Sequence, residues 1–436
     1  MKKILLVCML VLGYLCTPIQ VIAEEEKPEI TSDYVYMFDR TTKQVFWDQG
    51  STEKIYPASL TKIMTALVAI ENTDDFDKTV LIDEKIMAGL KEAGASRAGF
   101  NVGDVVTMRD LIYGTLLPSG AECTQALAYT ISGSVDGYVD LMNRKAQELG
   151  LVDTHYVNTT GLHDDNHYST LRDIATLLEY ALNNEMFYEV FTSNTYQAGT
   201  SFNYPTEGLK MESTAYKYIN TSNPNQPYAI EIDGFLGSKT GYTVEARYCL
   251  ASIAKVNDMD LMVITAHAWI ERKIPSHFVD AGIIYDTYRN LYQRNTVYTQ
   301  GDIIQESIMK YRFFNKDIDW EMPETLIWDL PIDTNEYQIE VTIPDVIDEN
   351  IKKGDVVGQI IITSYGDEVY REDIISDSNY NQNFILLGLA NTGEWMMDNL
   401  FVAVFGGILV VVSVFIITQR KPKRRKRRKT RNSRKI

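Results

Sequence analysis

The stretch Tyr56–Thr65 reads YPASLTKIMT and places a serine and a lysine three residues apart where an apolar helix begins. Residues 59–71 contain no proline or glycine, and apolar residues recur there at helical spacing. A spacing of three puts Ser59 and Lys62 on neighbouring positions of one helix face. The free N–H groups and positive dipole end of the helix N-terminus favour an alkoxide on Ser59 and oppose a proton on Lys62. The pattern predicts a serine nucleophile with Lys62 as its base.

The Ser-x-x-Lys spacing alone is weak evidence, because the chain contains it four times. Ser51 is separated from any helix by Pro57, Ser252 lies in a strand-like run, and Ser307 follows an alternating apolar segment. Only Ser59 begins an uninterrupted helical pattern. Without further motifs, however, Ser59 could equally be a helix-capping serine followed by a surface lysine.

Two further motifs support the catalytic interpretation. Lys239-Thr240-Gly241 occurs once and precedes a strand pattern at 247–256, and Ser119 lies in a Pro-Ser-Gly turn that begins a second apolar helix. Ser-x-x-Lys, Ser-x-Asn and Lys-Thr-Gly, in this order, are the motif set of one large class of acyl-serine enzymes.

With these motifs in order, the chain resembles the low-molecular-mass penicillin-binding proteins of the D-alanyl-D-alanine carboxypeptidase type. The resemblance covers residues 30–290 and continues more weakly to about 385. It implies a penicillin-binding/β-lactamase-like α/β (α+β) catalytic domain with an antiparallel sheet and a helical cluster, and no cofactor. The matching blocks are Pro57–Lys62, Pro118–Gly120, Gly161–His163 with His167–Thr170, and Lys239–Thr243.

The chemistry of peptide cleavage suggests a role for each catalytic residue. Ser59 attacks the carbonyl between two D-alanines to form an acyl-enzyme, Lys62 takes its proton, and Ser119 relays a proton to the leaving amine. The substrate is a peptidoglycan stem peptide, and β-lactams inhibit by acylating the same serine. The terminal carboxylate needs a cation and hydroxyl donors, which would come from Lys239, Thr240 and Thr243.

The resemblance implies further contacts. The backbone N–H groups of Ser59 and Tyr242 would form an oxyanion hole, and Gly241 would let the substrate backbone approach closely. Arg272 stands near the position of a family arginine that helps to hold the carboxylate, with a surface arginine as the alternative. The family usually has Asn at the third position of the middle motif, where this chain has Ala121.

Three functions remain open at this point. The first is a D,D-carboxypeptidase. The second is a β-lactamase or D,D-endopeptidase of the same fold, and the third is a weakly active wall-binding protein, suggested by Ala121. A zinc peptidase is disfavoured, because His163 and His167 lie in a loop-like segment and no third ligand has a recognisable spacing. We therefore predict no metal.

The two ends of the chain predict where the enzyme acts. Residues 1–23 have the basic start, apolar stretch and small cleavage site of a signal peptide. Residues 399–418 are apolar enough to predict a transmembrane helix, and the basic residues of 419–436 predict a cytoplasmic tail. We therefore expect a single-pass protein of the bacterial cell membrane, held in the lipid bilayer by this helix, with an extracellular catalytic domain.

Charge and cysteine content exclude other classes. Between Glu24 and Asp398 the chain has 59 acidic and 28 basic residues, a net charge of about −31. Such a surface repels polyanions, so no nucleic-acid partner is expected. Only Cys123 and Cys249 remain after the signal peptide, which excludes a disulfide scaffold and leaves a single bridge open.

The pattern of elements predicts two folded domains. The catalytic domain spans 30–288, and alternating segments at 295–385 predict a small β domain. Within the catalytic domain, helical patterns lie at 59–71, 107–117, 119–131 and 170–183, and strand patterns lie at 246–256 and 259–267.

Overall fold

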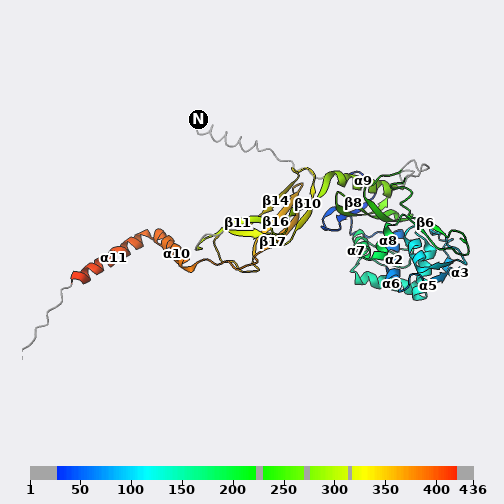
Figure 1. Cartoon of the computed structure of the whole chain (residues 1–436), viewed down its shortest axis with the longest axis horizontal. Coiled ribbons are helices and arrows are strands. Elements are labelled where there is room, and N and C mark those ends of the chain that lie inside the picture. The colour runs from blue at the N-terminus through cyan, green and yellow to red at the C-terminus, as the bar shows by residue number, and fades with distance from the viewer. Residues whose placement is uncertain (1–26, 222–228, 270–274, 313–316, 420–436) are drawn as a thin grey trace, which may run out of the picture. The chain divides into compact units, whose positions relative to one another are not determined.

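The computed structural model describes residues 27–221, 229–269, 275–312 and 317–419 (Figure 1). The predicted signal peptide and nearly all of the predicted basic tail lie outside these ranges. Contacts divide the chain into two compact units. The first comprises the residues up to Thr299 with Glu324–Ile339 and Ile362–Tyr370, and the second comprises Gln300–Pro323, Glu340–Ile361 and the residues from Arg371 onward. A separate β domain at 295–385 stays a prediction.

A five-stranded antiparallel sheet organises the first unit, with strand order β2-β1-β9-β8-β7. The two central strands β8 and β9 are buried over most of their length, which explains their nearly continuous apolar sequences. The edge strand β7 carries the Lys-Thr-Gly motif. The strands are β1 (Tyr34–Asp39), β2 (Val45–Gln49), β7 (Phe235–Thr243), β8 (Arg247–Val256) and β9 (Met259–Ala268).

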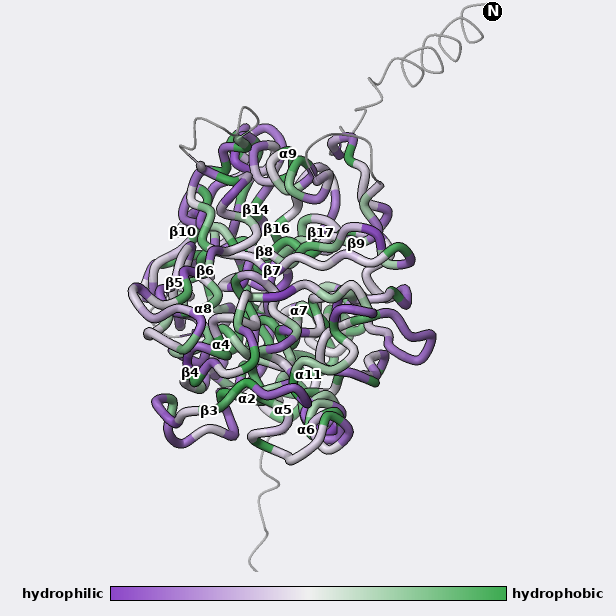
Figure 2. The backbone as a smooth tube through the Cα atoms, turned by 90° about the vertical axis from the view of Figure 1, so that its right-hand side faces the viewer, coloured by the Kyte–Doolittle hydropathy of each residue, from purple (hydrophilic) through white to green (hydrophobic). Residues whose placement is uncertain are grey.

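A cluster of helices packs on one face of this sheet, and Figure 2 shows hydrophobic residues concentrated around α2. All residues from Thr61 to Ile70 are buried, so α2 is the centre of the cluster. The four predicted helices are present, with ends displaced by one or two residues. The helices are η1 (Ala58–Leu60), α2 (Thr61–Glu71), α3 (Glu84–Met87), α4 (Met108–Leu116), α5 (Ala121–Ser132), α6 (Val135–Glu148), α7 (Leu171–Leu182) and α8 (Glu185–Thr192).

The long helix α9 (Ser276–Leu291) covers the other face of the sheet. Its buried residues Phe278, Ile284 and Tyr285 share a second apolar core with Leu250 and Val263 of the strands. The sheet is therefore buried on both faces, which holds its edge strand β7 in a fixed position.

The remaining strands form small sheets. β3 (Thr79–Leu81) pairs with β4 (Val105–Thr107), β5 (Thr195–Gln197) with β6 (Lys210–Glu212), and β10 (Tyr292–Tyr298) with β13 (Leu326–Pro331). Two three-stranded sheets follow the orders β12-β11-β15 and β14-β16-β17. Their strands are β11 (Ile303–Met309), β12 (Ile318–Glu321), β14 (Tyr337–Val341), β15 (Val346–Ile347), β16 (Val356–Ser364) and β17 (Asp367–Ile375).

The predicted transmembrane helix at residues 399–418 is wrong. A membrane span requires one helix that is both long enough and apolar enough to cross about 30 Å of hydrocarbon. Within the described part of the chain, no helix meets both requirements. The C-terminal residues instead form α10 (Phe384–Asp398) and α11 (Leu400–Gln419). The anchoring in a lipid bilayer and the single-pass topology that depended on this helix are withdrawn with it.

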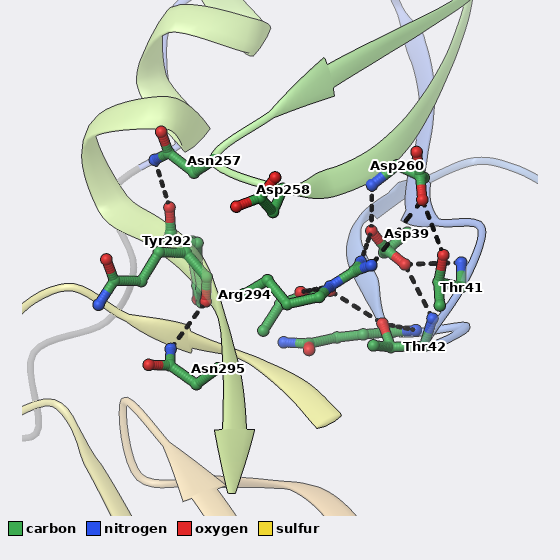
Figure 3. A network of polar contacts seen from close by, with 12 residues as sticks. Asp39, Thr41, Thr42, Asn257, Asp258, Asp260, Tyr292, Arg294 and Asn295 are labelled. Atoms are coloured by element: carbon green, nitrogen blue, oxygen red, sulfur yellow. Dashed lines mark hydrogen bonds and ion pairs between the residues drawn. The ribbon is translucent and has the colours of Figure 1, made fainter. Parts of the chain in front are cut away.

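One arginine ties β10 to the catalytic sheet (Figure 3). Arg294 contacts the carboxylate of Asp39, donates from Nε to Asp329 at 2.9 Å, and lies 3.8 Å from Asp260. The side chains of Asp39 and Asp329 are completely buried. The single guanidinium therefore lies among carboxylates from three strands, β1, β9 and β13, and forms its closest ion pairs with the two buried ones.

We expect Arg294→Ala to lower the free energy of unfolding by about 3–5 kcal/mol, because two buried carboxylates would lose their cationic partner. Urea unfolding of the purified protein measures this loss. Arg289→Ala is the matched control, since its ion pairs with Asp233 and Asp286 are exposed and its effect should stay below about 1 kcal/mol. Equal losses in the two variants would contradict the structural role given to Arg294.

Candidate active site

A cleft of about 470 Å³ opens where the helical cluster meets strand β7. Its lining comes from η1, from the first residues of α2, α5 and α9, from the 94–96 and 160–162 loops, and from β7. Arg272 lies outside the described residues. The predicted site residues that line the cleft are Ser59, Lys62, Ser119, Thr240, Gly241, Tyr242 and Thr243.

Lys62 lies directly beside the predicted nucleophile. Its Nζ is 2.9 Å from Ser59 Oγ and donates to the carbonyl oxygen of Thr160 at 2.7 Å. Lys62 is only 2% exposed, and this burial lowers its pKa from 10.5 to about 7, against an opposing effect of the Glu122 charge. A neutral amine at this position can accept a proton from the Ser59 hydroxyl.

A second buried lysine supports Ser119. Lys239 is completely buried, and its Nζ donates to Ser119 Oγ at 3.0 Å and to the carbonyl oxygen of Thr240 at 2.9 Å. Burial, together with the nearby charge of Lys62, lowers the pKa of Lys239. Lys239 therefore reaches the cleft through Ser119 rather than by lining it. Ser119 itself has a φ of +66°, an uncommon backbone conformation that turns its side chain toward this lysine.

The turn before the nucleophile is tightly enclosed. Ala58 has a φ of +46°, and its carbonyl oxygen accepts from Thr61 Oγ1 at 2.8 Å. Thr61 Oγ1 in turn lies 2.7 Å from Nε2 of His167. A side chain at Gly161 would place its Cβ 1.8 Å from the Ala58 oxygen, so only glycine fits there. His167 thus holds the nucleophile turn, a role that its loop position did not indicate.

Gly241 lines the cleft and also packs closely against the turn that carries Ser59. A Cβ at this position would lie 3.0 Å from Ala58 Cβ, from the Pro57 oxygen and from Ser59 N. The glycine therefore lets the turn at Pro57–Ser59 pack against β7, and the expectation that it also makes room for the substrate backbone stays a prediction. This close approach brings the Ser59 backbone N–H next to β7, where the resemblance also expects the Tyr242 N–H.

The other motif residues take distinct positions along β7. Thr240 Oγ1 lies 2.8 Å from Oγ1 of Thr214, a threonine that no sequence motif indicated. Thr243 Oγ1 accepts from the backbone N–H of Ala246 at 3.0 Å and shapes the turn into β8. Tyr242 is 46% exposed, and its ring centroid lies 4.7 Å from that of Tyr248.

The unusual position in the middle motif, Ala121, is fully buried yet lines the cleft. The neighbouring Glu122 does not replace the missing amide. Its carboxylate accepts from the backbone N–H of Gly99 at 2.8 Å, and the residue is not part of the cleft lining. Burial raises the pKa of Glu122. The cleft therefore has a methyl group where the family has a hydrogen-bonding side chain.

Both described cysteines are free and buried, so the bridge left open by the sequence is not formed. Burial raises the pKa of Cys249 to about 12 and also raises that of Cys123. Protonated, buried thiols pack as small apolar groups and are poor nucleophiles.

Comparison with known proteins agrees with this geometry. The sequence model of the family described as D-alanyl-D-alanine carboxypeptidase (peptidase S11) matches residues 21–269. A D-alanyl-D-alanine carboxypeptidase of Bacillus subtilis is 27% identical over 368 residues, which cover 82% of this chain and 88% of the relative. One from Escherichia coli is 30% identical over 279 residues, covering 59% of this chain and 62% of the relative.

Solved structures extend the comparison to the fold. The DD-transpeptidase of Streptomyces K15 is 27% identical, covers 60% of this chain and 98% of its own, and superposes with a TM-score of 0.52. A D-alanyl-D-alanine carboxypeptidase of Francisella tularensis, at 21% identity, shares the fold over 85% of this chain and 98% of its own with a TM-score of 0.63. The chain belongs to the D-alanyl-D-alanine carboxypeptidase family of serine peptidases.

Proposed function

We propose that this enzyme removes the terminal D-alanine from peptidoglycan pentapeptides through an acyl-enzyme on Ser59. The observation that carries the proposal is the 2.9 Å contact between Lys62 Nζ and Ser59 Oγ inside the cleft. The pKa of about 7 for Lys62 supports the proposal, because the side chain is then neutral in about half of the molecules near pH 7. A neutral lysine and a positioned hydroxyl are the two components that acylation needs.

The proton follows a short path in this mechanism. Lys62 takes the proton of Ser59 as its oxygen attacks the peptide carbonyl. Ser119 then gives its hydroxyl proton to the nitrogen of the departing D-alanine and receives the proton that Lys62 carries. Lys239 fixes the Ser119 hydroxyl through the 3.0 Å hydrogen bond. The Ser59 and Tyr242 N–H groups stabilise the oxyanion, where one donor contributes roughly 3–4 kcal/mol. Water then hydrolyses the ester and restores Ser59.

The remaining contacts of the substrate follow from this pose. The terminal carboxylate lies near Thr240, with Thr243 and the buried charge of Lys239 contributing to its binding and Arg272 as a further candidate. A β-lactam presents a carbonyl and a carboxylate at a similar spacing and acylates the same serine. We further propose that residues 1–23 direct export, so that the enzyme meets its substrate in the cell wall.

The test is to incubate the purified protein with a pentapeptide wall fragment and to weigh the products. Loss of one D-alanine supports the carboxypeptidase. Cleavage of cross-linked peptides without trimming indicates an endopeptidase, and hydrolysis of penicillin without trimming indicates a β-lactamase. An unchanged substrate would leave only wall binding and would refute the proposal.

We expect Ser59→Ala to abolish covalent labelling by fluorescent penicillin, because the acyl group would have no oxygen to attach to. Lys62→Ala should fold normally and label at least about a hundredfold more slowly, since general-base catalysis contributes 10²–10⁴-fold. Gel fluorescence measures both. Lys54→Ala is the matched control, because Lys54 belongs to a Ser-x-x-Lys pair outside the cleft. Label retained on another serine in the Ser59 variant would show that the nucleophile is misassigned.

We expect penicillin acylation to fall about tenfold from pH 8 to pH 6. The pKa of Lys62 is lowered to about 7, so the base is mostly neutral above this pH and mostly protonated below it. The negative charge of Glu122 raises the pKa of Lys62, so Glu122→Gln should move the acidic limb to lower pH. Stopped-flow acylation across about pH 5–11 measures the acidic limb of the wild type and of the Glu122→Gln variant. An acidic limb near pH 10 would show that Lys62 titrates like an exposed lysine.

We expect Ala121→Asn to change substrate affinity by up to about tenfold and to leave acylation of Ser59 intact. The new amide would face the cleft and add one or two hydrogen bonds of about 0.5–1.5 kcal/mol each. Peptide-trimming kinetics and penicillin acylation rates of both forms measure the effect. Unchanged constants would show that position 121 does not contact the substrate, and complete inactivation would show that the methyl group is required.

A further inference from the structure

His277 is a buried histidine whose side chain has no hydrogen-bond partner among the described residues. It is 3% exposed, and neither Nδ1 nor Nε2 is paired. A buried polar group without a partner is unfavourable by about 1–3 kcal/mol, so native proteins rarely keep one without a reason. His277 also lines the cleft that holds Ser59, so this residue belongs to the wall of the site.

The ring of His277 is held in place by aromatic neighbours. Its centroid lies 4.8 Å from the ring of Tyr248 and 4.1 Å from that of Phe278. Phe278 belongs to the apolar core beneath α9. The imidazole therefore has a defined orientation before any ligand binds, which reduces the entropy lost on binding.

This end of the cleft is electropositive. His277 is the second residue of α9, a helix of 16 residues whose N-terminal N–H groups carry a partial positive charge. The charge of Lys239 acts on His277, and Lys217 lines the same cleft. No aspartate or glutamate is among the described residues that line it, although the chain has 59 acidic residues. A strongly acidic protein thus keeps an acid-free cleft.

We propose that His277, at the N-terminus of α9, donates a hydrogen bond to the terminal carboxylate of the peptide substrate and thereby selects a free C-terminus. This inference rests on the proposed function of the cleft. The occupant is a carboxylate because this end offers several donors and positive charge and its described lining contains no acidic side chain. The donors are the α9 N-terminus, the lysines, the Thr240 hydroxyl and an imidazole N–H. His277 is a specificity-determining residue, separate from the Ser59–Lys62 chemistry.

The neutral imidazole is sufficient for this role. Burial and the charge of Lys239 both lower the pKa of His277, which is about 3 as a result. The ring facing the cleft is therefore uncharged near neutral pH and has one N–H to donate. The nearby Tyr248 phenol is neutral, because burial raises its pKa.

The test compares two peptides that differ only at their end, one with a terminal D-alanine carboxylate and one with a D-alanine amide. For His277→Phe, which removes both ring nitrogens, we expect KM for the carboxylate peptide to rise at least about tenfold with little change in kcat. The amide peptide keeps an acceptor oxygen but has no negative charge, so its KM should rise much less. His277→Asn keeps an N–H donor and should retain part of the preference. Mass spectrometry of the products over time gives KM and kcat for each variant and each peptide.

The thermal midpoint separates this role from a structural one. Replacing an unpaired buried polar ring by Phe should leave the midpoint unchanged or raise it, whereas a structural histidine would lower it. His155→Asn is the matched control, because His155 is exposed and lies outside the cleft. This variant should leave KM and kcat unchanged for both peptides. Equal losses for both peptides, or no loss for either, would overturn the inference. A wild type that neither trims the peptide nor is labelled on Ser59 would instead overturn the proposed function.

Discussion

The burial of two lysines in one cleft is the constraint on which the site depends. Lys62 and Lys239 are both removed from water, so desolvation destabilises the charged form of each, and the charge of Lys62 further destabilises that of Lys239. Both ammonium groups donate to uncharged acceptors rather than to carboxylates. Lys62 donates to the Thr160 carbonyl, and Lys239 donates to the Ser119 hydroxyl and the Thr240 carbonyl. A carboxylate partner would keep the ammonium charged, whereas neutral acceptors allow Lys62 to lose its proton.

Close packing of three chain segments keeps these lysines in position. The nucleophile turn is enclosed between the Gly161 loop and β7, where neither Gly161 nor Gly241 could carry a side chain without displacing Ala58. Two contacts in series also fix this turn: His167 contacts the Thr61 hydroxyl, and that hydroxyl donates to the Ala58 carbonyl. The positive φ of Ala58 is maintained by these neighbours, because an isolated turn would relax to a more common conformation.

Sequence reasoning located the parts of the site that are encoded locally. The Ser59–Lys62 contact follows from a spacing of three on one helix, and the Lys-Thr-Gly strand follows from its motif. Contacts across long sequence separations were not predictable, because no local pattern joins Thr160 to Lys62 or places His277 in the cleft. The prediction of a transmembrane helix failed for a different reason. Apolar composition over 399–418 was taken as sufficient for a membrane span, and no described helix meets the requirement.

The two ends of the cleft separate the reaction from the choice of substrate. Acylation depends on η1 and α2, which provide Ser59 and Lys62, while the carboxylate end is formed by β7 and α9 from the opposite side of the sheet. A methyl group at position 121 removes one contact between these ends without touching either lysine hydrogen bond. Under the proposed function, loss of that amide removes a hydrogen bond to the peptide, so the contacts at the C-terminal carboxylate become a larger share of the binding energy. In the proposed binding mode, the C-terminus is therefore the part of the substrate on which selection mainly depends.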